Sequence, residues 1–265
     1  MHAMLNIGVR AARAAGRVIT KGYENTSDLR VTSKGVSDFV TEIDSEAEQT
    51  IIATIQKSYP DHAFIGEESG KTEGDNTFVW VIDPLDGTTN FIRGIPHFSI
   101  SIALLYKGKL DQAVVFDPIR GELFTASRGA GAQLNGYRIR VTSPKSLETS
   151  VLATALPFRN KDDYPEAIEK FNSLFLASED VRRMGSAALD LAYVAAGRYD
   201  GYFEKGLKSW DIAAGSLIVR EAGGLCTDYS GNNDPVYDEL SQPGTANGIV
   251  AGSPKTVQQM VKVLK

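Results

Sequence analysis

The feature that most constrains this chain is an apolar run that ends abruptly in acidic residues, proline and glycine: Trp80-Val81-Ile82-Asp83-Pro84-Leu85-Asp86-Gly87. The run predicts a buried strand, and its end predicts that Asp83 and Asp86 face solvent or a cleft. Two carboxylates about 4 Å apart repel by about 4 kcal/mol at an effective dielectric of about 20. A divalent cation removes this penalty, and magnesium prefers oxygen ligands. The segment therefore indicates a magnesium site.

The residues after this strand favour an anion site beside the metal. Gly87 permits unusual backbone angles, and the amides of Gly87, Thr88 and Thr89 are predicted to begin a helix or a nest that suits phosphate. An ordinary surface turn is the alternative, because Asp, Pro and Gly are common turn residues.

Two further acidic clusters favour the metal interpretation. Glu67-Glu68 follows the apolar run Phe64-Ile65, and Asp211 opens an apolar helix that ends at Gly223-Gly224. Each has a simpler alternative, since a glutamate here can be a solvated loop residue and Asp211 can be an N-cap. The sequence does not distinguish Glu67 from Glu68, and it does not establish that the clusters meet in space.

Composition limits the classes of function. The 265 residues are 42% hydrophobic and 23% charged, enough for a core in one large domain or two closely packed domains. A net charge of -5, with no long basic run, gives no reason to expect direct nucleic-acid or membrane binding. Cys226 is the single cysteine, so no intrachain disulfide is possible, which suits a reducing compartment and predicts a cytoplasmic location.

The N-terminal segment predicts an ordinary amphipathic helix. Arg10, Arg13 and Arg17 interrupt its apolar residues, so it lacks the uninterrupted apolar core of a secretory signal, and nothing later approaches transmembrane length. An organelle transit peptide, which is also rich in arginine and poor in acids, is the less favoured alternative. The predicted buried stripe has helical spacing and comprises Ile7, Ala11, Ala15, Val18 and Gly22.

The first half otherwise predicts one helix and a mostly antiparallel sheet. The helix runs from about Asp44 to Tyr59, with Thr41/Asp44 and Ser45/Glu48 as possible capping boxes and Pro60 as its stop. Its apolar residues are Ile43, Ala47, Ile51 and Ile55. Strands are predicted at 63–65, 78–82, 97–106 and 112–116, with tight turns at Lys107-Gly108 and Asn135-Gly136. Residues 78–140 should thus form the sheet.

The second half predicts alternating helices and short strands. Helical patterns cover 187–196 and 211–222, and strand-like runs cover 201–203, 225–229 and 249–251. A soft boundary near 141–150 divides the chain into an N-terminal α+β half, 1–145, which carries most metal ligands, and a C-terminal α/β half, 146–265. No linker-like or repeated segment separates the halves, so we expect them to pack as one body.

Three ordered motifs resemble those of the inositol monophosphatase family over nearly the whole chain. They are Gly66-Glu67-Glu68-Ser69, the segment Trp80 to Phe91, and Trp210-Asp211-Ile212-Ala213-Ala214-Gly215 with Glu221-Ala222-Gly223-Gly224. The opening Met1-His2-Ala3-Met4-Leu5-Asn6-Ile7 resembles the bacterial inositol-1-monophosphatase branch. The resemblance implies a layered α/β/α/β/α sandwich, a homodimer, two or three magnesium ions per site, and inhibition by lithium.

The resemblance also implies roles for individual residues. Glu67, Asp83 and the Leu85 carbonyl would bind the first magnesium ion, and Asp83, Asp86 and Asp211 the second. Glu67, Asp44 and Thr88 would form the catalytic group, in which Asp44 and Thr88 position a metal-acidified water for in-line displacement. Gly87, Thr88 and Thr89 would bind the phosphate. Lys34, in a predicted loop over 34–38, would add a positive charge, unless it is only a solvated loop residue.

Substrate contacts implied by the resemblance lie in the second half. Gly185, Ser186, Ala187, Glu204 and Asp211 would meet the polyol. The alternatives are a helix cap for Ser186 and a surface acid for Glu204. Arg182 and Arg183 precede this segment and receive no role.

The predicted function is hydrolysis of a small phosphate monoester, with inositol 1-phosphate as the leading substrate. Related nucleotide or sugar phosphatases are an alternative. So is a mainly protein-binding role in transcription antitermination with retained phosphatase activity, because bacterial relatives are implicated in it through contact with transcription factors. A Ser-His-Asp hydrolase is disfavoured, since His2, His62 and His97 lack a nucleophile-elbow context, and no Walker loop is present.

Overall fold

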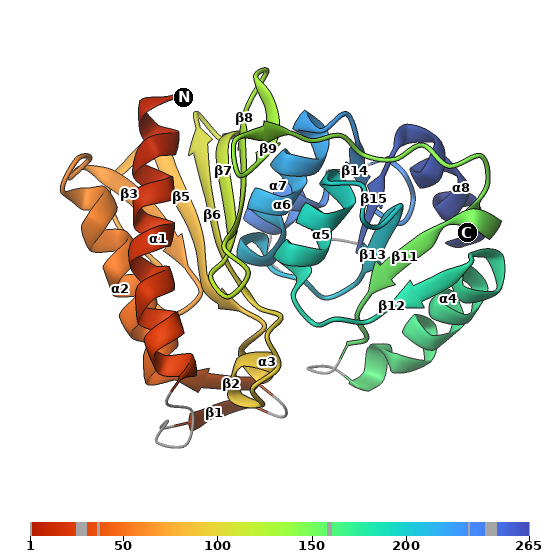
Figure 1. Ribbon diagram of the computed structural model, residues 1–265, viewed down its shortest axis with the longest axis horizontal. Helices are drawn as coiled ribbons and strands as arrows, with labels where there is room; N and C mark the ends of the chain where they lie inside the picture. Colours follow the sequence, from red (N-terminus) through yellow and green to blue (C-terminus); the bar gives the residue numbers. More distant parts are fainter. Residues whose placement is uncertain are drawn as a thin grey trace.

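The computed structural model describes residues 2–24, 31–35, 38–157, 161–232, 234–241 and 248–264, and side chains in these ranges except at 31–35, 38–40 and 161. The described chain is a mixed α/β structure with two main sheets (Figure 1). The helices are α1 (Ala3–Tyr23), α2 (Glu42–Gln56), α3 (Thr88–Ile92), α4 (Tyr164–Ala177), α5 (Ala187–Ala195), α6 (Ser209–Glu221), α7 (Pro235–Ser241) and α8 (Pro254–Leu264).

The larger sheet has eight strands in the order β10-β9-β8-β7-β6-β5-β3-β4, and only the β3–β5 pair within it is parallel. Its strands are β3 (His62–Gly66), β4 (Gly70–Lys71), β5 (Asp75–Asp86), β6 (Ser99–Tyr106), β7 (Lys109–Asp117), β8 (Glu122–Ser127), β9 (Gly131–Leu134) and β10 (Tyr137–Arg138). The antiparallel sheet predicted for 78–140 is therefore confirmed.

The second sheet has five strands in the order β12-β11-β13-β15-β14 and mixes parallel with antiparallel pairs. Its strands are β11 (Val151–Thr154), β12 (Asp180–Arg182), β13 (Gly201–Glu204), β14 (Leu225–Thr227) and β15 (Ile249–Gly252). A separate hairpin pairs β1 (Val31–Gly35) with β2 (Asp38–Thr41). Short 3-10 turns occupy Leu147–Thr149 and Lys161–Asp163.

Alternation of side chains along the strands produces the layers. On β5, Trp80 and Ile82 pack with the core under α1 and α2, whereas Val79 and Val81 pack with the core around α5 and α6. Tyr202 of β13 joins that central core, and its neighbour Phe203 faces α4 and α8 on the outer side. The result is the predicted α/β/α/β/α sandwich (Figure 1).

Helix α1 buries a different set of residues from the predicted stripe. Ile7 and Val18 are only half-buried, and the buried positions include Leu5, Val9 and Ile19 as well as Ala11, Ala15 and Gly22. Small residues determine which face of α1 packs against the sheet, because a Cβ at Gly16 would lie 2.7 Å from the Phe116 ring. Glycine lets the helix approach the sheet closely, a contribution that a count of apolar side chains does not register.

Helix α2 begins two residues before the predicted start and ends three residues before Tyr59. The Thr41/Asp44 capping box forms, with the Thr41 amide donating to Asp44 Oδ2 at 2.9 Å. The Ser45/Glu48 box does not form, because Ser45 lies within the helix and Glu48 accepts hydrogen bonds from another segment.

Both predicted tight turns are confirmed by their backbone angles. Lys107 and Gly108 join β6 to β7, Asn135 and Gly136 join β9 to β10, and all four have positive φ. In the second half, α5, α6, β13, β14 and β15 match the predicted elements within a few residues. The division near residue 145 stays a prediction.

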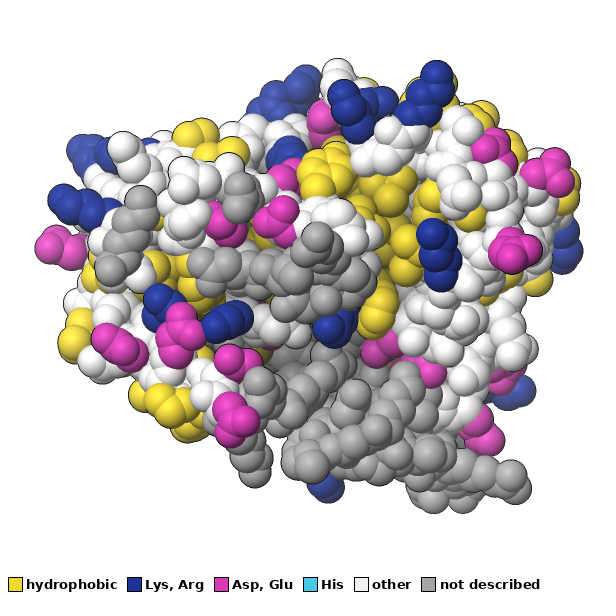
Figure 2. Space-filling model, turned by 180° about the vertical axis from the view of Figure 1, so that it is seen from behind, with side chains coloured by type: hydrophobic (Ala, Val, Ile, Leu, Met, Phe, Trp, Pro, Cys, Tyr) yellow, Lys and Arg dark blue, Asp and Glu magenta, His cyan; other side chains and the backbone are white. Residues whose placement is uncertain are grey.

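The described surface is mixed in charge where Figure 2 shows it, with Lys and Arg interspersed among Asp and Glu. The most exposed large hydrophobic side chains are Tyr137 at 81% and Leu176 at 75%, so apolar surface remains on β10 and α4. Within the described ranges, no helix combines the length and apolar character needed to cross a membrane.

Candidate metal and phosphate site

An irregularity in β5 brings two acidic residues to one side of the strand. Residues three apart in a regular strand point to opposite faces. Asp83 pairs with Ser101 of β6, but Asp86 pairs with Ser99, so β5 carries one extra residue between them. This bulge, which contains Pro84, turns Asp86 to the same side as Asp83.

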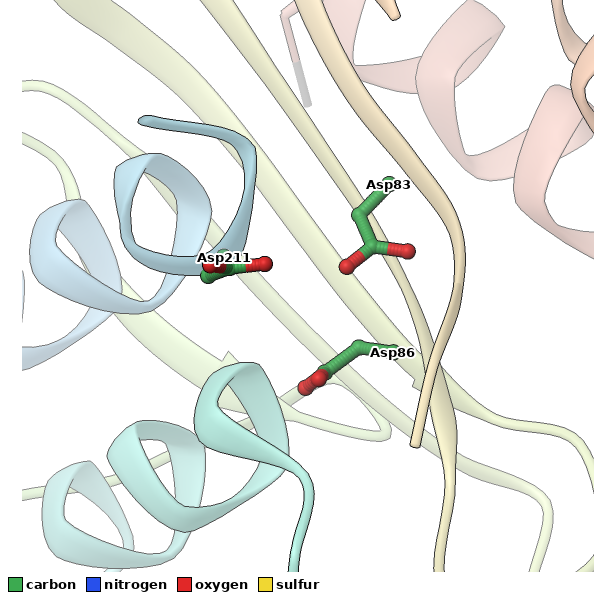
Figure 3. Close-up of side chains that lie close together, drawn as sticks. All are labelled: Asp83, Asp86 and Asp211. Atoms are coloured by element: carbon green, nitrogen blue, oxygen red, sulfur yellow. The ribbon is translucent and has the colours of Figure 1, made fainter. Parts of the chain in front are cut away.

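A third acid comes from α6 in the other half of the chain. Asp83, Asp86 and Asp211 each present a carboxylate oxygen within 4.8 Å of the others, and their side chains point toward one another (Figure 3). Asp211 is the third residue of α6 and accepts a 2.6 Å hydrogen bond from the Lys208 amide, so the N-cap alternative is wrong. Carboxylate oxygens so close to one another fit a hard divalent cation such as magnesium.

The electrostatics of the cluster favour a bound cation. Burial raises the pKa of Asp83 well above its usual value, and the charges of Glu67, Asp86 and Asp211 raise it further. Burial, with the charge of Asp211, raises the pKa of Asp86 to about 7. A divalent ion stabilises the ionised forms and so reverses both shifts.

The start of α5 holds Asp86 in place. Asp86 Oδ2 accepts hydrogen bonds from the Ser186 hydroxyl and the Ala188 amide, each at 2.7 Å. Ser186 stands at the N-cap of α5, but its side chain makes no capping bond to the helix. The hydroxyl therefore binds Asp86, which is not the role that the helix-cap alternative assigned to it.

The structure distinguishes Glu67 from Glu68. Glu67 follows β3, lines the same cavity as Asp83 and adds to the repulsion that raises the Asp83 pKa. Its amide donates to the Ile82 carbonyl at 3.1 Å, which ties it to β5 beside Asp83. The Glu68 amide instead donates to Glu48 of α2. Glu67 is thus the acid that faces the cluster.

Thr88 and Asp44 form a hydrogen-bonded pair at the edge of the cluster. Thr88 Oγ1 lies 3.1 Å from both Asp44 Oδ1 and the Leu85 carbonyl, and its single proton serves one of them at a time. Asp44 Oδ2 accepts the amide and the hydroxyl of Thr41. Burial raises the pKa of Asp44, and the hydrogen bonds from Thr41 and Thr88 partly offset this.

The backbone between the cluster and α3 has a conformation that requires glycine. Gly87 has φ of 100° and caps α3, and a Cβ there would lie 3.1 Å from the His97 carbonyl and 3.2 Å from the Gly185 carbonyl. Buried Asn90 secures this close approach by donating to the carbonyls of His97 and Met184 at 2.7 and 2.8 Å. These bonds tie α3 to the segment that follows it and to the segment before α5.

One cavity of about 440 Å³ collects most of the predicted site residues: Glu67, Asp83, Leu85, Asp86, Gly87, Thr88, Thr89, Gly185, Ser186, Ala187, Glu204 and Asp211. Asp44 reaches it through Thr88. Lys34 belongs to β1 rather than to the predicted loop, and its side chain is outside the described residues.

Glu204 is buried at the end of β13, so the surface-acid alternative is wrong. Its side chain is 7% exposed and accepts a hydrogen bond from the Tyr202 hydroxyl. Burial raises the pKa of Glu204 to about 8, and the hydrogen bond from Tyr202 partly opposes the shift. A carboxyl group with so high a pKa is largely protonated near neutral pH, so it can both accept and donate hydrogen bonds.

Sequence reasoning gave no role to several residues at the site. Arg93, Arg183 and Lys205 also line the cavity and bring positive charge to it. Asn90 was part of the motif, and its two cross-chain hydrogen bonds carry no local sequence signal.

Comparisons with known proteins agree over the whole length of the chain. The profile of the "Inositol monophosphatase family" matches residues 1–263. The chain is 54% identical to a protein named "Nus factor SuhB" from Escherichia coli strain K12, with 98% of this chain and 95% of that protein covered.

Solved structures show the same fold. The crystal structure of extragenic suppressor protein suhB from Bartonella henselae superposes with a TM-score of 0.93 at 40% identity, covering 100% of this chain and 99% of that one. The inositol monophosphatase from Anabaena gives a TM-score of 0.85 at 35% identity, covering 98% and 94%. Because the family profile, the sequence relatives and the solved structures all agree, this chain belongs to the inositol monophosphatase family.

Proposed function

We propose that this protein hydrolyses a small phosphate monoester with the help of magnesium, and that inositol 1-phosphate is its principal substrate. The observation that carries the proposal is the convergence of Asp83, Asp86 and Asp211, from two distant segments, in one cavity with Thr88 and Glu204. Family membership supports a phosphatase.

The donor set suits two magnesium ions, or three. Glu67, Asp83 and the Leu85 carbonyl would hold the first ion, and Asp83 would share the second with Asp86 and Asp211. When bound, magnesium lowers the pKa of a coordinated water and neutralises charge on the leaving ester oxygen. The hydrogen bonds from Ser186 and Ala188 fix the orientation of Asp86, which limits the rearrangement needed to bind a cation.

Thr88 and Asp44 are suited to orient the attacking water. The hydroxyl of Thr88 can accept a hydrogen bond from water while it donates to Asp44 Oδ1, so the water proton has a path to a buried carboxylate. The backbone amides at Gly87, Thr88 and Thr89, with the Thr89 hydroxyl, would bind the phosphate oxygens.

Another part of the cavity lining is suited to a polyol. Glu204 offers carboxyl oxygens from β13, and Gly185, Ser186 and Ala187 bring backbone from the start of α5. Asp211 lines the same cavity and would contact substrate as well as metal. A cavity of about 440 Å³ lies in the size range of small-molecule sites.

The experiment that tests the proposal is phosphate release from a panel of inositol, nucleotide and sugar phosphates, with and without magnesium. We expect the highest kcat/KM with inositol 1-phosphate and no turnover after chelation. A higher kcat/KM for a nucleotide or sugar phosphate would replace the proposed substrate, and metal-independent turnover would contradict the mechanism.

Replacement of Glu204 by alanine should reduce efficiency toward inositol 1-phosphate by about 10- to 100-fold, because hydroxyl groups of the ring lose a buried partner at about 1 to 3 kcal/mol. p-Nitrophenyl phosphate has no ring hydroxyls, so its lower efficiency should change little. Steady-state kinetics with both substrates, at constant magnesium, measures the difference.

Tyr202→Phe is the matched control, because it removes the internal hydrogen bond to Glu204 while it retains the carboxyl group. We expect it to keep most of the preference for inositol 1-phosphate. Equal losses on both substrates in Glu204→Ala would instead show that Glu204 supports the metal cluster or the fold.

Lithium should inhibit the enzyme at saturating magnesium. A monovalent ion at the second site, among Asp83, Asp86 and Asp211, would not match the charge of magnesium and would leave product phosphate bound. The measurement is turnover of inositol 1-phosphate against lithium concentration. The resemblance to the family leads us to expect inhibition within about tens of millimolar lithium. Full activity through this range would mean that the second site does not accept lithium.

We also propose a homodimer in the cytoplasm and a second role through a transcription-factor partner. The relatives named as Nus factors favour the transcription role. The lone buried Cys226 is consistent with a reducing compartment. Binding measurements with purified transcription proteins, and sedimentation for the dimer, test these proposals. Lys34 remains a proposed source of positive charge near the phosphate.

A further inference from the structure

Helix α2 and its N-cap residue present three buried polar side chains along one face. Thr41, Asp44 and Glu48 stand at positions i, i+3 and i+7, which lie on the same side of a helix. They are 2%, 1% and 2% exposed. A buried carboxylate is costly unless it is hydrogen-bonded, so the partners of each acid indicate what the face does.

The Glu48 carboxylate binds the backbone that follows Glu67. Glu48 Oε2 accepts the Glu68 amide at 3.0 Å, and Oε1 accepts the Ser69 amide at 2.8 Å. The fit is close, because a Cβ at Gly66 would lie 2.5 Å from Glu48 Oε2. Two consecutive amides on two oxygens of one carboxylate fix the turn between β3 and β4.

Glu67 is therefore restrained on both sides. Its own amide is bonded to the Ile82 carbonyl of β5, and the next two amides are bonded to Glu48. One turn earlier on the same helix face, Asp44 accepts the hydroxyl of Thr88. A single rigid helix thus connects the segment that carries Glu67 to the segment that carries Thr88.

We propose that Glu48 is a positioning residue for the first divalent-cation site, acting through the placement of Glu67. The inference rests on the proposed function, in which Glu67 is a metal ligand. Glutamine has one acceptor oxygen and cannot satisfy two amide donors with two oxygens. Loss of a residue that orients a metal ligand typically weakens metal binding by about 10- to 100-fold.

The test is calorimetric titration of the metal-free, full-length protein with magnesium, without substrate. The variants are Glu48→Gln, Glu67→Gln, and Glu46→Gln, which makes the same change at an exposed position of α2. We expect Glu48→Gln to raise the Kd of the first ion by about 10- to 100-fold and to leave kcat at saturating magnesium close to that of the wild type. Glu46→Gln should bind as the wild type does.

The outcomes separate the inference from the proposed function. If Glu67→Gln weakens binding but Glu48→Gln lowers only the melting temperature, Glu48 is merely structural and the inference is overturned. If Glu67→Gln binds magnesium normally, the ligand role of Glu67 fails, and the inference fails with it. Should Glu48→Gln not fold, Gly66→Ala takes its place, because the added Cβ displaces the Glu48 carboxylate. An unchanged Kd in Gly66→Ala would overturn the inference.

Discussion

Asp83→Asn should lose at least about 1,000-fold in kcat/KM for inositol 1-phosphate. Asp83 is the residue proposed to bind both ions, and charge stabilisation by metal contributes several kcal/mol to such reactions. Asparagine has a similar size, and its oxygen can still accept the Leu85 amide that Asp83 Oδ1 accepts at 3.0 Å. The variant should therefore fold. Near-normal turnover by the folded variant would contradict the shared-ligand assignment.

The same substitution should stabilise the metal-free protein at high pH. The pKa of Asp83 in the folded state is well above its usual 3.8, so its stabilising contribution is complete below about pH 4 and is lost as the pH rises. The Asp86 pKa of about 7 adds to this loss between about pH 4 and pH 7. Asparagine cannot ionise, so the variant escapes the Asp83 part of the loss.

Thermal unfolding at pH 5 and pH 8, with and without magnesium, measures this effect. Without magnesium, the melting temperature of Asp83→Asn should exceed that of the wild type by more at pH 8 than at pH 5. Magnesium should raise the melting temperature of the wild type and have little effect on the variant. A metal-free variant that melts below the wild type at pH 8 would show that mutual repulsion does not destabilise this cluster.

Asp44→Asn should reduce kcat by about 100- to 10,000-fold with magnesium binding preserved, the range expected when proton transfer by a positioned group is lost. The asparagine oxygen can accept the amide and hydroxyl of Thr41 as Asp44 Oδ2 does. Its amide can donate to Thr88 Oγ1, whose own proton then serves the Leu85 carbonyl. The hydrogen-bond geometry survives, but the amide cannot receive a proton.

The matched comparison is Asp190→Asn, which removes a different buried carboxylate, beside His97, that has no assigned part in catalysis. Calorimetry with magnesium and rapid-quench kinetics distinguish binding from chemistry. Similar losses of kcat in both variants would mean that replacing any buried carboxylate by an amide disturbs the site. Asp44 would then have no specific role in proton transfer.

Structural features that depend only on short stretches of sequence were predictable. The capping box of α2 needs only Thr41 and Asp44, and the hairpin turns need only dipeptides that tolerate positive φ. The apolar run of β5 and the acids at its end predicted a strand that leads into a metal site. The short strands β8, β11 and β12 were not predicted, because pairing with neighbours in the sheet, rather than local composition, determines them.

Features that depend on distant segments were not predictable from single residues. The bulge at Pro84 and Leu85 places Asp86 beside Asp83, and its position follows from the register with β6. The choice of Glu67 over Glu68 depends on Glu48, which lies about twenty positions earlier on another element. The roles of the site residues follow from resemblance to the family rather than from local sequence.

The origin of the three clustered aspartates has a consequence for synthesis on the ribosome. Asp83 and Asp86 emerge together in the first half of the nascent chain, whereas Asp211 emerges much later, on α6. Until α6 has packed against the larger sheet, the nascent protein carries only part of the carboxylate cluster. The proposed second cation site, which needs Asp211, therefore cannot be complete before α6 has packed across the core that the two sheets share, whereas the donors of the proposed first site all emerge early.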